Sequence, residues 1–193
     1  MYSRTLGLVC LLALALTATN SGAGDNVRHV ELSVAGSAQA FVNDGYTDLA
    51  LNMPVRVGTF VTKDALLEVE GIFTVIAPEG YNHKSAITVS LNGSYNFPAS
   101  DKILPFLLFG LGYSNGAPLG NVIAGSLCNQ RDFRVLNAGA GAKFLFTPKA
   151  ALRVEYRYQN FLEVDIIDIG FGRHDENINF GVHSMFFGVS LFL

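Results

Sequence analysis

The chain has 193 residues, of which 50% are hydrophobic and only 15% are charged, and its formal net charge is −3. Soluble domains usually carry about 25% charged residues, so this composition is unlike that of an ordinary soluble domain. It also excludes intrinsic disorder, which needs few apolar residues, and it offers no cluster of Lys and Arg that could neutralise the phosphates of a nucleic acid.

The N-terminus has the pattern of a secretory signal peptide. A basic residue precedes an apolar run over residues 6–16, and the small residues Ser21 and Ala23 fit a cleavage site. The run is too short for a membrane-spanning helix, which needs about 20 apolar residues. We therefore predict a signal peptide over residues 1–23 and a single mature domain over residues 24–193.

From residue 28 onward, apolar and polar residues alternate with a period of two, and no helical period is sustained over three turns. This pattern predicts an all-β domain of eight strands, longer than the roughly 5 or 6 residues usual in soluble sheets. The expected strands cover residues 28–41, 48–61, 65–76, 85–97, 103–114, 132–146, 150–162 and 178–193. Pro54 and Pro105 fall inside two of them, and since proline lacks the N–H that a ladder needs, we expect a bulge at each.

The connections between the expected strands differ in length at the two ends of the sheet. Short turns of Pro, Asp, Ser and Lys lie at residues 62–64, 98–102 and 147–149. Longer segments alternate with them at residues 77–84, 115–131 and 163–177. The first connection of this longer series, residues 43–47, is itself brief. The alternation predicts an antiparallel up-and-down barrel with one plain end and one elaborated end, as in outer-membrane barrels.

Each expected strand has one apolar and one polar face. In the strand at 150–162, Arg153, Glu155 and Arg157 share the polar face. Successive side chains of a strand point to opposite sides, so the apolar residues between them form the other face. The charged residues on the polar faces of all the strands are Arg56, Lys143, Arg153, Arg157, Glu31, Glu68, Glu70 and Glu155. The alternation alone leaves open whether they line a closed lumen or cover the outside of a soluble, lipocalin-like barrel.

Three features favour a charged lumen and an apolar exterior. Aromatic residues recur beside the short turns, as in the interfacial belt of a membrane barrel, at Phe60, Phe97, Phe146 and Phe192. The last strand keeps its apolar face up to Leu193, and a closed barrel would pair that strand with the first one. Several glycines fall on the nominal inner face, where space is scarcest: Gly110, Gly112, Gly139, Gly141 and Gly188.

Two segments carry a recognisable pattern. These are PFLLFGLGYS at residues 105–114 and NAGAGAKFLFTPKAALRVEYRYQNF at residues 137–161. They resemble the small outer-membrane β-barrel family of the OmpA transmembrane-domain and OmpX type. The resemblance implies an eight-stranded antiparallel barrel in the cell outer membrane, inserted by the barrel assembly machinery and surrounded by outer-membrane lipid and lipopolysaccharide. In that family charged side chains fill the interior, and here these would include Lys143, Arg153, Glu155 and Arg157.

An eight-stranded barrel leaves an interior just wide enough for side chains. We therefore expect a monomeric protein with a closed lumen and a structural or surface-interaction role. The segments 115–131, which holds Cys128, and 163–177 are the expected sites for an extracellular ligand. Carboxylates in the second segment lack the spacing of a calcium loop, so we predict no metal site, and no motif suggests a cofactor.

Three alternative functions remain open at this point: a lipid A-modifying barrel enzyme, a small-solute porin and a soluble periplasmic binding barrel. Acyl chemistry needs Ser, His and a carboxylate gathered on one side of the wall. His183 and Ser184 are adjacent in a strand and so face opposite ways, while His83 and His174 fall in loops without an obvious nucleophile. We therefore expect no enzymatic activity.

Overall fold

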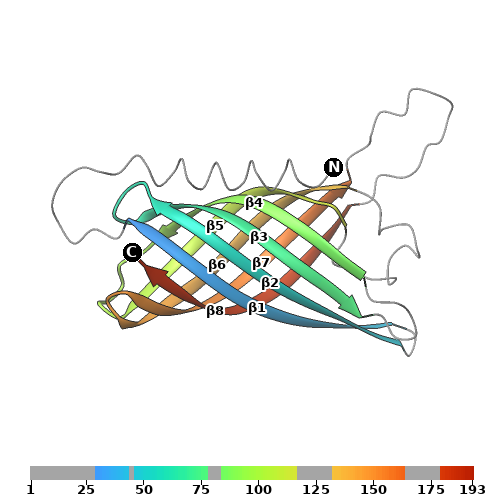
Figure 1. The fold of residues 1–193 in the computed structure, drawn as a ribbon, viewed down its shortest axis with the longest axis horizontal. Helices are drawn as coiled ribbons and strands as arrows, with labels where there is room; N and C mark the ends of the chain where they lie inside the picture. Colours follow the sequence, from blue (N-terminus) through green and yellow to red (C-terminus); the bar gives the residue numbers. More distant parts are fainter. Residues whose placement is uncertain (1–28, 44–45, 78–83, 117–131, 164–178) are drawn as a thin grey trace, which may run out of the picture.

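The structure is a computed structural model that describes residues 29–43, 46–77, 84–116, 132–163 and 179–193. Eight antiparallel strands follow one another around a closed barrel (Figure 1). They are β1 (Val30–Asn43), β2 (Tyr46–Phe60), β3 (Ala65–Ala77), β4 (Lys84–Asn96), β5 (Ile103–Ser114), β6 (Phe133–Thr147), β7 (Ala150–Glu163) and β8 (Asn179–Phe192). The expected architecture is confirmed, and every expected strand boundary lies within two residues of the observed one. Within the described ranges, the chain forms no helix that could cross a bilayer.

The barrel closes where the first strand meets the last. Glu31 on β1 lies opposite Phe192 on β8, and the pairing continues along the two strands as far as Gly36 opposite Phe187. The backbone N–H of His29 donates to the carbonyl of Leu193 at 3.0 Å, so the start of β1 and the end of β8 lie at the same end of the barrel. We call this the short-turn end, because the connections between β2 and β3, β4 and β5, and β6 and β7 are found there.

The opposite end holds the other connections, and their lengths differ. Residues 44–45 alone join β1 to β2, whereas residues 115–132 join β5 to β6 and residues 164–178 join β7 to β8. The first connection is thus even briefer than the segment expected at residues 43–47, so the alternation of short and long connections does not extend to this hairpin. It holds for the second half of the chain.

The two expected proline bulges are absent from the described strands. Pro54 lies opposite Ile72 in an unbroken register between β2 and β3. On its other side, the pairing with β1 stops and then resumes with the same offset, so the missing N–H leaves a gap rather than an extra residue. Pro105 lies opposite Ala142 in an unbroken register between β5 and β6, and its carbonyl accepts a hydrogen bond from the backbone N–H of Phe97 at 2.7 Å, so no extra residue is inserted there. The register shift lies instead between Leu145 and Thr147, beside the tight turn into β7.

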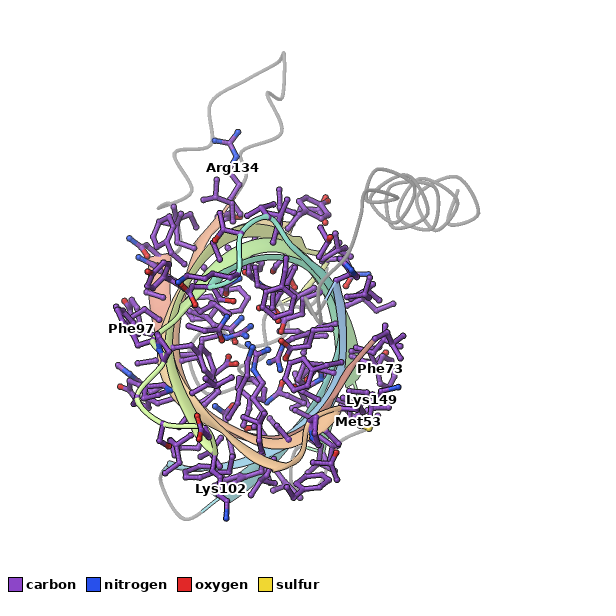
Figure 2. All side chains as sticks on the ribbon, turned by 90° about the vertical axis from the view of Figure 1, so that its left-hand side faces the viewer. Met53, Phe73, Phe97, Lys102, Arg134 and Lys149 are labelled. Atoms are coloured by element: carbon purple, nitrogen blue, oxygen red, sulfur yellow. The ribbon has the colours of Figure 1, made fainter. Side chains whose placement is uncertain are left out.

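The wall is apolar outside and polar inside. Large side chains such as Leu91, Phe109 and Leu111 are about half exposed on the outer surface, while the residues between them are buried in the interior. Figure 2 looks along the barrel from the end that holds the C-terminus and shows Met53 and Phe73 pointing away from the wall. This arrangement is the inverse of a lipocalin-like barrel, whose interior is apolar, so the soluble alternative is excluded.

Inward-facing glycines make room for larger neighbours. A Cβ on Gly141 would lie 2.7 Å from the ring of Phe106, and a Cβ on Gly110 would overlap the side-chain amide of Asn92. Both glycines lie on the inner face, as expected from the sequence. They allow side chains from adjacent strands to lie flat across the wall of a narrow lumen.

The orientation of the wall predicts how it responds to charge. Leu91 lies near the middle of β4, and its side chain is 51% exposed on the outer surface. We expect Leu91→Arg to lower the free energy of unfolding by about 2–4 kcal/mol, because the guanidinium would face hydrocarbon. Urea titration of the protein folded into lipid vesicles measures this cost.

The matched control is Val61→Arg, since Val61 is 63% exposed but lies in the turn after β2. We expect this change to cost less than about 1 kcal/mol, as for a charge near the interface. Equal costs at the two positions would contradict the assignment of the outer surface to lipid.

Candidate functional site: the charged lumen

All eight charged residues singled out from the sequence lie in the lumen. Arg153, Glu155 and Arg157 alternate along β7 and point inward together, because residues two apart share a face. Their partners come from four other strands: Glu31 on β1, Arg56 on β2, Glu68 and Glu70 on β3, and Lys143 on β6. Each of the eight is at most 1% exposed. Strand β7 is therefore the central element of one buried network.

The part of the network nearest the short-turn end is centred on Arg153. Its Nη1 atom lies 2.6 Å from Glu68 Oε1 and 3.4 Å from Glu31 Oε1. Lys143 Nζ lies 2.6 Å from the second carboxylate oxygen of Glu31. Two cations thus share one carboxylate, and Arg153 connects β7 to both β1 and β3.

The next layer is centred on Glu155. This carboxylate accepts hydrogen bonds from Arg153 Nε at 3.0 Å and from Arg157 Nε at 2.6 Å. Glu70 forms ion pairs with both Arg157 and Arg56, and Arg56 Nη2 lies 3.5 Å from Glu155 Oε1. Arg56, Glu70, Arg157 and Glu155 therefore form a closed ring of alternating charge. Such a ring offsets the cost of removing each ion from water.

Side-chain amides continue the network toward the other end of the barrel. Asn92 Nδ2 donates to Glu70 at 3.3 Å, Asn137 Nδ2 donates to Asn92 at 3.1 Å, and Gln159 Nε2 donates to Asn137 at 3.0 Å. Strand alternation places these three amides on the polar faces, although they were not among the expected site residues. Their signal is parity, since each lies an even number of residues from the inward-facing residues of its own strand.

Two aromatic rings lie against the cations. The guanidinium carbon of Arg153 is 4.6 Å from the centre of the Phe106 ring, and that of Arg157 is 5.3 Å from the centre of the Phe186 ring. Both distances allow a cation–π interaction. Sequence analysis missed both rings. For Phe186 a signal exists: Phe186 and Phe187 are adjacent in a strand, so one of them has to point inward.

A cluster of aromatic rings lies in the lumen at the end opposite the short turns. Phe133 and Phe161 are fully buried and point inward from β6 and β7, and Phe180 reaches them from β8. The ring centres of Phe161 and Phe180 lie 5.1 Å apart in a stacked arrangement, and Phe133 lies edge-on to both rings. We call these three residues the aromatic cap.

The four aromatics expected at the membrane boundary divide into two pairs. Phe97 and Phe146 are exposed on the outside next to the short turns, and Figure 2 shows Phe97 on the outer wall. Phe60 and Phe192 instead point into the lumen, with their ring centres 6.4 Å apart, and Phe192 is only 2% exposed. The expectation for this second pair is corrected, because Phe60 shares strand parity with the inward-facing Arg56, and Phe192 shares it with the buried Ser190.

The segments expected to carry surface chemistry lie mostly outside the described residues. This applies to 117–131 with Cys128 and to 164–178, and also to the signal peptide over residues 1–23. In the part of the chain that the structure does describe, no cluster of His, Cys, Asp and Glu could hold a metal ion.

Comparison with known proteins agrees with the geometry of the barrel. The sequence profile of the outer membrane protein β-barrel domain matches residues 6–189. The fold is similar to that of Neisserial surface protein A, with a TM-score of 0.61 and 17% identity over 85% of this chain and 96% of the other. It is also similar to the N-terminal barrel domain of OprF from Pseudomonas aeruginosa, with a TM-score of 0.53 and 18% identity over 86% of this chain and 98% of that one. No curated protein sequence matches the chain significantly.

The closed ring of charge predicts a large cost for removing one member. We expect Arg157→Met to lower the free energy of unfolding by about 3–5 kcal/mol, because Glu70 and Glu155 lose a buried counter-charge. Urea titration in vesicles measures it. Lys102→Met, at an exposed turn residue, is the control and should change stability by less than about 0.5 kcal/mol. Similar effects of the two substitutions would show that the ring does not stabilise the barrel.

Proposed function

The chain belongs to the outer membrane protein β-barrel domain family and is a transmembrane barrel of the outer membrane. From this premise we propose that its lumen is closed to the passage of solutes. Its role is structural or lies in surface interactions at the end with the longer connections. The observation that supports this proposal is the filled lumen, in which eight charged side chains are paired with one another.

Three successive layers oppose free conduction through the barrel. Phe60 and Phe192 narrow the short-turn end, the ion-pair network fills the centre, and the aromatic cap lies beyond the amides. A solute that crossed the lumen would have to separate buried ion pairs, and a buried charge left without its partner costs about 3–5 kcal/mol. We therefore favour a closed barrel over a small-solute porin.

The proposed partners follow from the apolar wall and the elaborated end. The wall contacts outer-membrane lipid. The end with the longer connections, which we place outside the cell and call the external end, contacts lipopolysaccharide. The barrel assembly machinery inserts the chain, which then acts as a monomer. The segments 115–131 and 163–177 connect strands at the external end and are the proposed site for an extracellular ligand.

We further propose that the barrel is not an acyl-transfer or hydrolytic enzyme. His183 is exposed on the outer surface, where its Nδ1 atom lies 2.6 Å from the hydroxyl of Tyr156. Ser184 is buried in the lumen and accepts a hydrogen bond from Gln39 Nε2 at 2.6 Å. The wall thus separates the base from the neighbouring hydroxyl, so the two cannot form a nucleophile–base pair.

The closed lumen predicts that the protein does not conduct ions across a membrane. We expect the purified, folded protein to give no large and stable conductance steps in a planar bilayer, because the ion-pair network fills the pore. An open porin added to the same bilayer serves as a positive control for insertion. A retarded or advanced band on unboiled SDS gels, relative to boiled sample, verifies folding. Large, stable single-channel steps from the folded protein would overturn the proposal.

The absence of enzymatic activity predicts unchanged lipid A. Expression of the protein in a Gram-negative host should leave the number and length of lipid A acyl chains as in cells with the empty vector. Mass spectrometry of extracted lipid A measures this. Loss or gain of an acyl chain that disappears in His183→Ala would establish an enzyme instead.

A further inference from the structure

The seam between β1 and β8 is paired along only part of its length. Pairing runs from Glu31 opposite Phe192 to Gly36 opposite Phe187 and then ends. Beyond this point β1 pairs only with β2, and β8 pairs only with β7, in the described residues. The β6–β7 pairing, by contrast, extends over nearly the full strands, from Phe133 to Thr147. The barrel is therefore closed at the short-turn end of this seam and unpaired toward the external end.

The unpaired stretch begins within the membrane. An apolar band about 25 Å tall takes about 10 residues of a tilted strand. Gly36 is the seventh residue of β1, so the residues that follow it lie in the external half of the band. Backbone groups there have no water to bond, and a wall without ladder bonds at that depth is unfavourable unless other groups supply them.

The same level of β1 is weakly held on its other side. Pairs with β2 stop at Val34 opposite Val55 and resume at Ser37 opposite Asn52. Pro54 lies in this gap and cannot donate to the ladder. Gly36 has no side chain, and its outward-facing position is open, since a Cβ there would meet no other atom within 4 Å. Gly36 and Pro54 together have the properties of a hinge.

One side chain bridges the unpaired strands. Gln39 Nε2 donates to the backbone carbonyl of His183 at 2.7 Å and to Ser184 Oγ at 2.6 Å. Asn52 Nδ2 donates to Gln39 Oε1 at 3.4 Å, and Asn52 Oδ1 accepts a hydrogen bond from Thr74 Oγ1 at 2.8 Å. The side-chain amide of Gln39 on β1 thus replaces the backbone ladder to β8. It is held in place by Asn52 on β2, which is bonded in turn to Thr74 on β3.

We propose that the external half of this seam is a lateral gate. The external part of the hairpin formed by β1 and β2 turns about Gly36 and Pro54, and Gln39 latches it to β8. When the latch opens, the external half of the lumen communicates with the outer leaflet of the membrane through the wall. This inference goes beyond the proposed function, because a lateral opening leaves the ion-pair network across the axis in place.

Spin labels on the outer surface test the gate. One pair is Ala38→Cys with Met185→Cys, which would face each other if the register continued past Gly36. The matched control is Val34→Cys with Val189→Cys, which do face each other in the paired part. All four positions are exposed on the outside, and both pairs are made in a Cys128→Ser background. Dipolar broadening of the EPR spectrum in vesicles reports the separation of each pair.

The gate predicts a different response from the two pairs. The control pair should show strong broadening that Gln39→Ala leaves unchanged. The pair at positions 38 and 185 should show weaker broadening, and Gln39→Ala should abolish most of it. Gln39→Glu, whose ionised carboxylate cannot donate to the His183 carbonyl, should act in the same way and guards against a folding defect in one variant. Equal broadening of both pairs, unaffected by either substitution, would show a fully paired seam and overturn the proposal.

Discussion

Every cation in the lumen has to find its counter-charge inside the same cylinder, because the wall separates it from bulk water. Arg153 meets this requirement by reaching carboxylates on β1 and β3 as well as Glu155 on its own strand. The requirement also restricts strand register. A slip of one residue in β7 would turn Arg153, Glu155 and Arg157 toward lipid, so the network and the pairing of the strands specify each other.

The uncharged residues of the interior are arranged around these ions. The ring of Phe106 lies against both Arg153 and Lys143, and it fits there because Gly141 on the facing strand has no side chain. On the other side of the network, Phe186 lies against Arg56 and Arg157. The aromatic rings thus exclude water from the ion pairs while interacting favourably with their positive members.

Much of this arrangement could be predicted from the sequence, because strand alternation assigns each residue to a face. Arg153 and Glu155 were assigned correctly to the polar face, and so were their partners on other strands. Phe60 and Phe192 were misplaced because proximity to a turn was weighed above parity. The incomplete seam at Gly36 could not be predicted, since the extent of pairing depends on two strands that lie at opposite ends of the chain. Pro54 suggested a bulge, but the structure shows only a gap in the pairing between β1 and β2 at that residue.

The division of charge along the chain has a consequence for how the cylinder is completed. Strands β1 to β3 contribute three lumenal carboxylates, Glu31, Glu68 and Glu70, but a single cation, Arg56. Strands β6 and β7 contribute three cations and a single carboxylate, Glu155. Each half of the chain therefore carries an unbalanced charge of opposite sign, and neither half is neutral on its own. The two half-sheets therefore attract one another, and the lumenal charge of each is balanced only by the other.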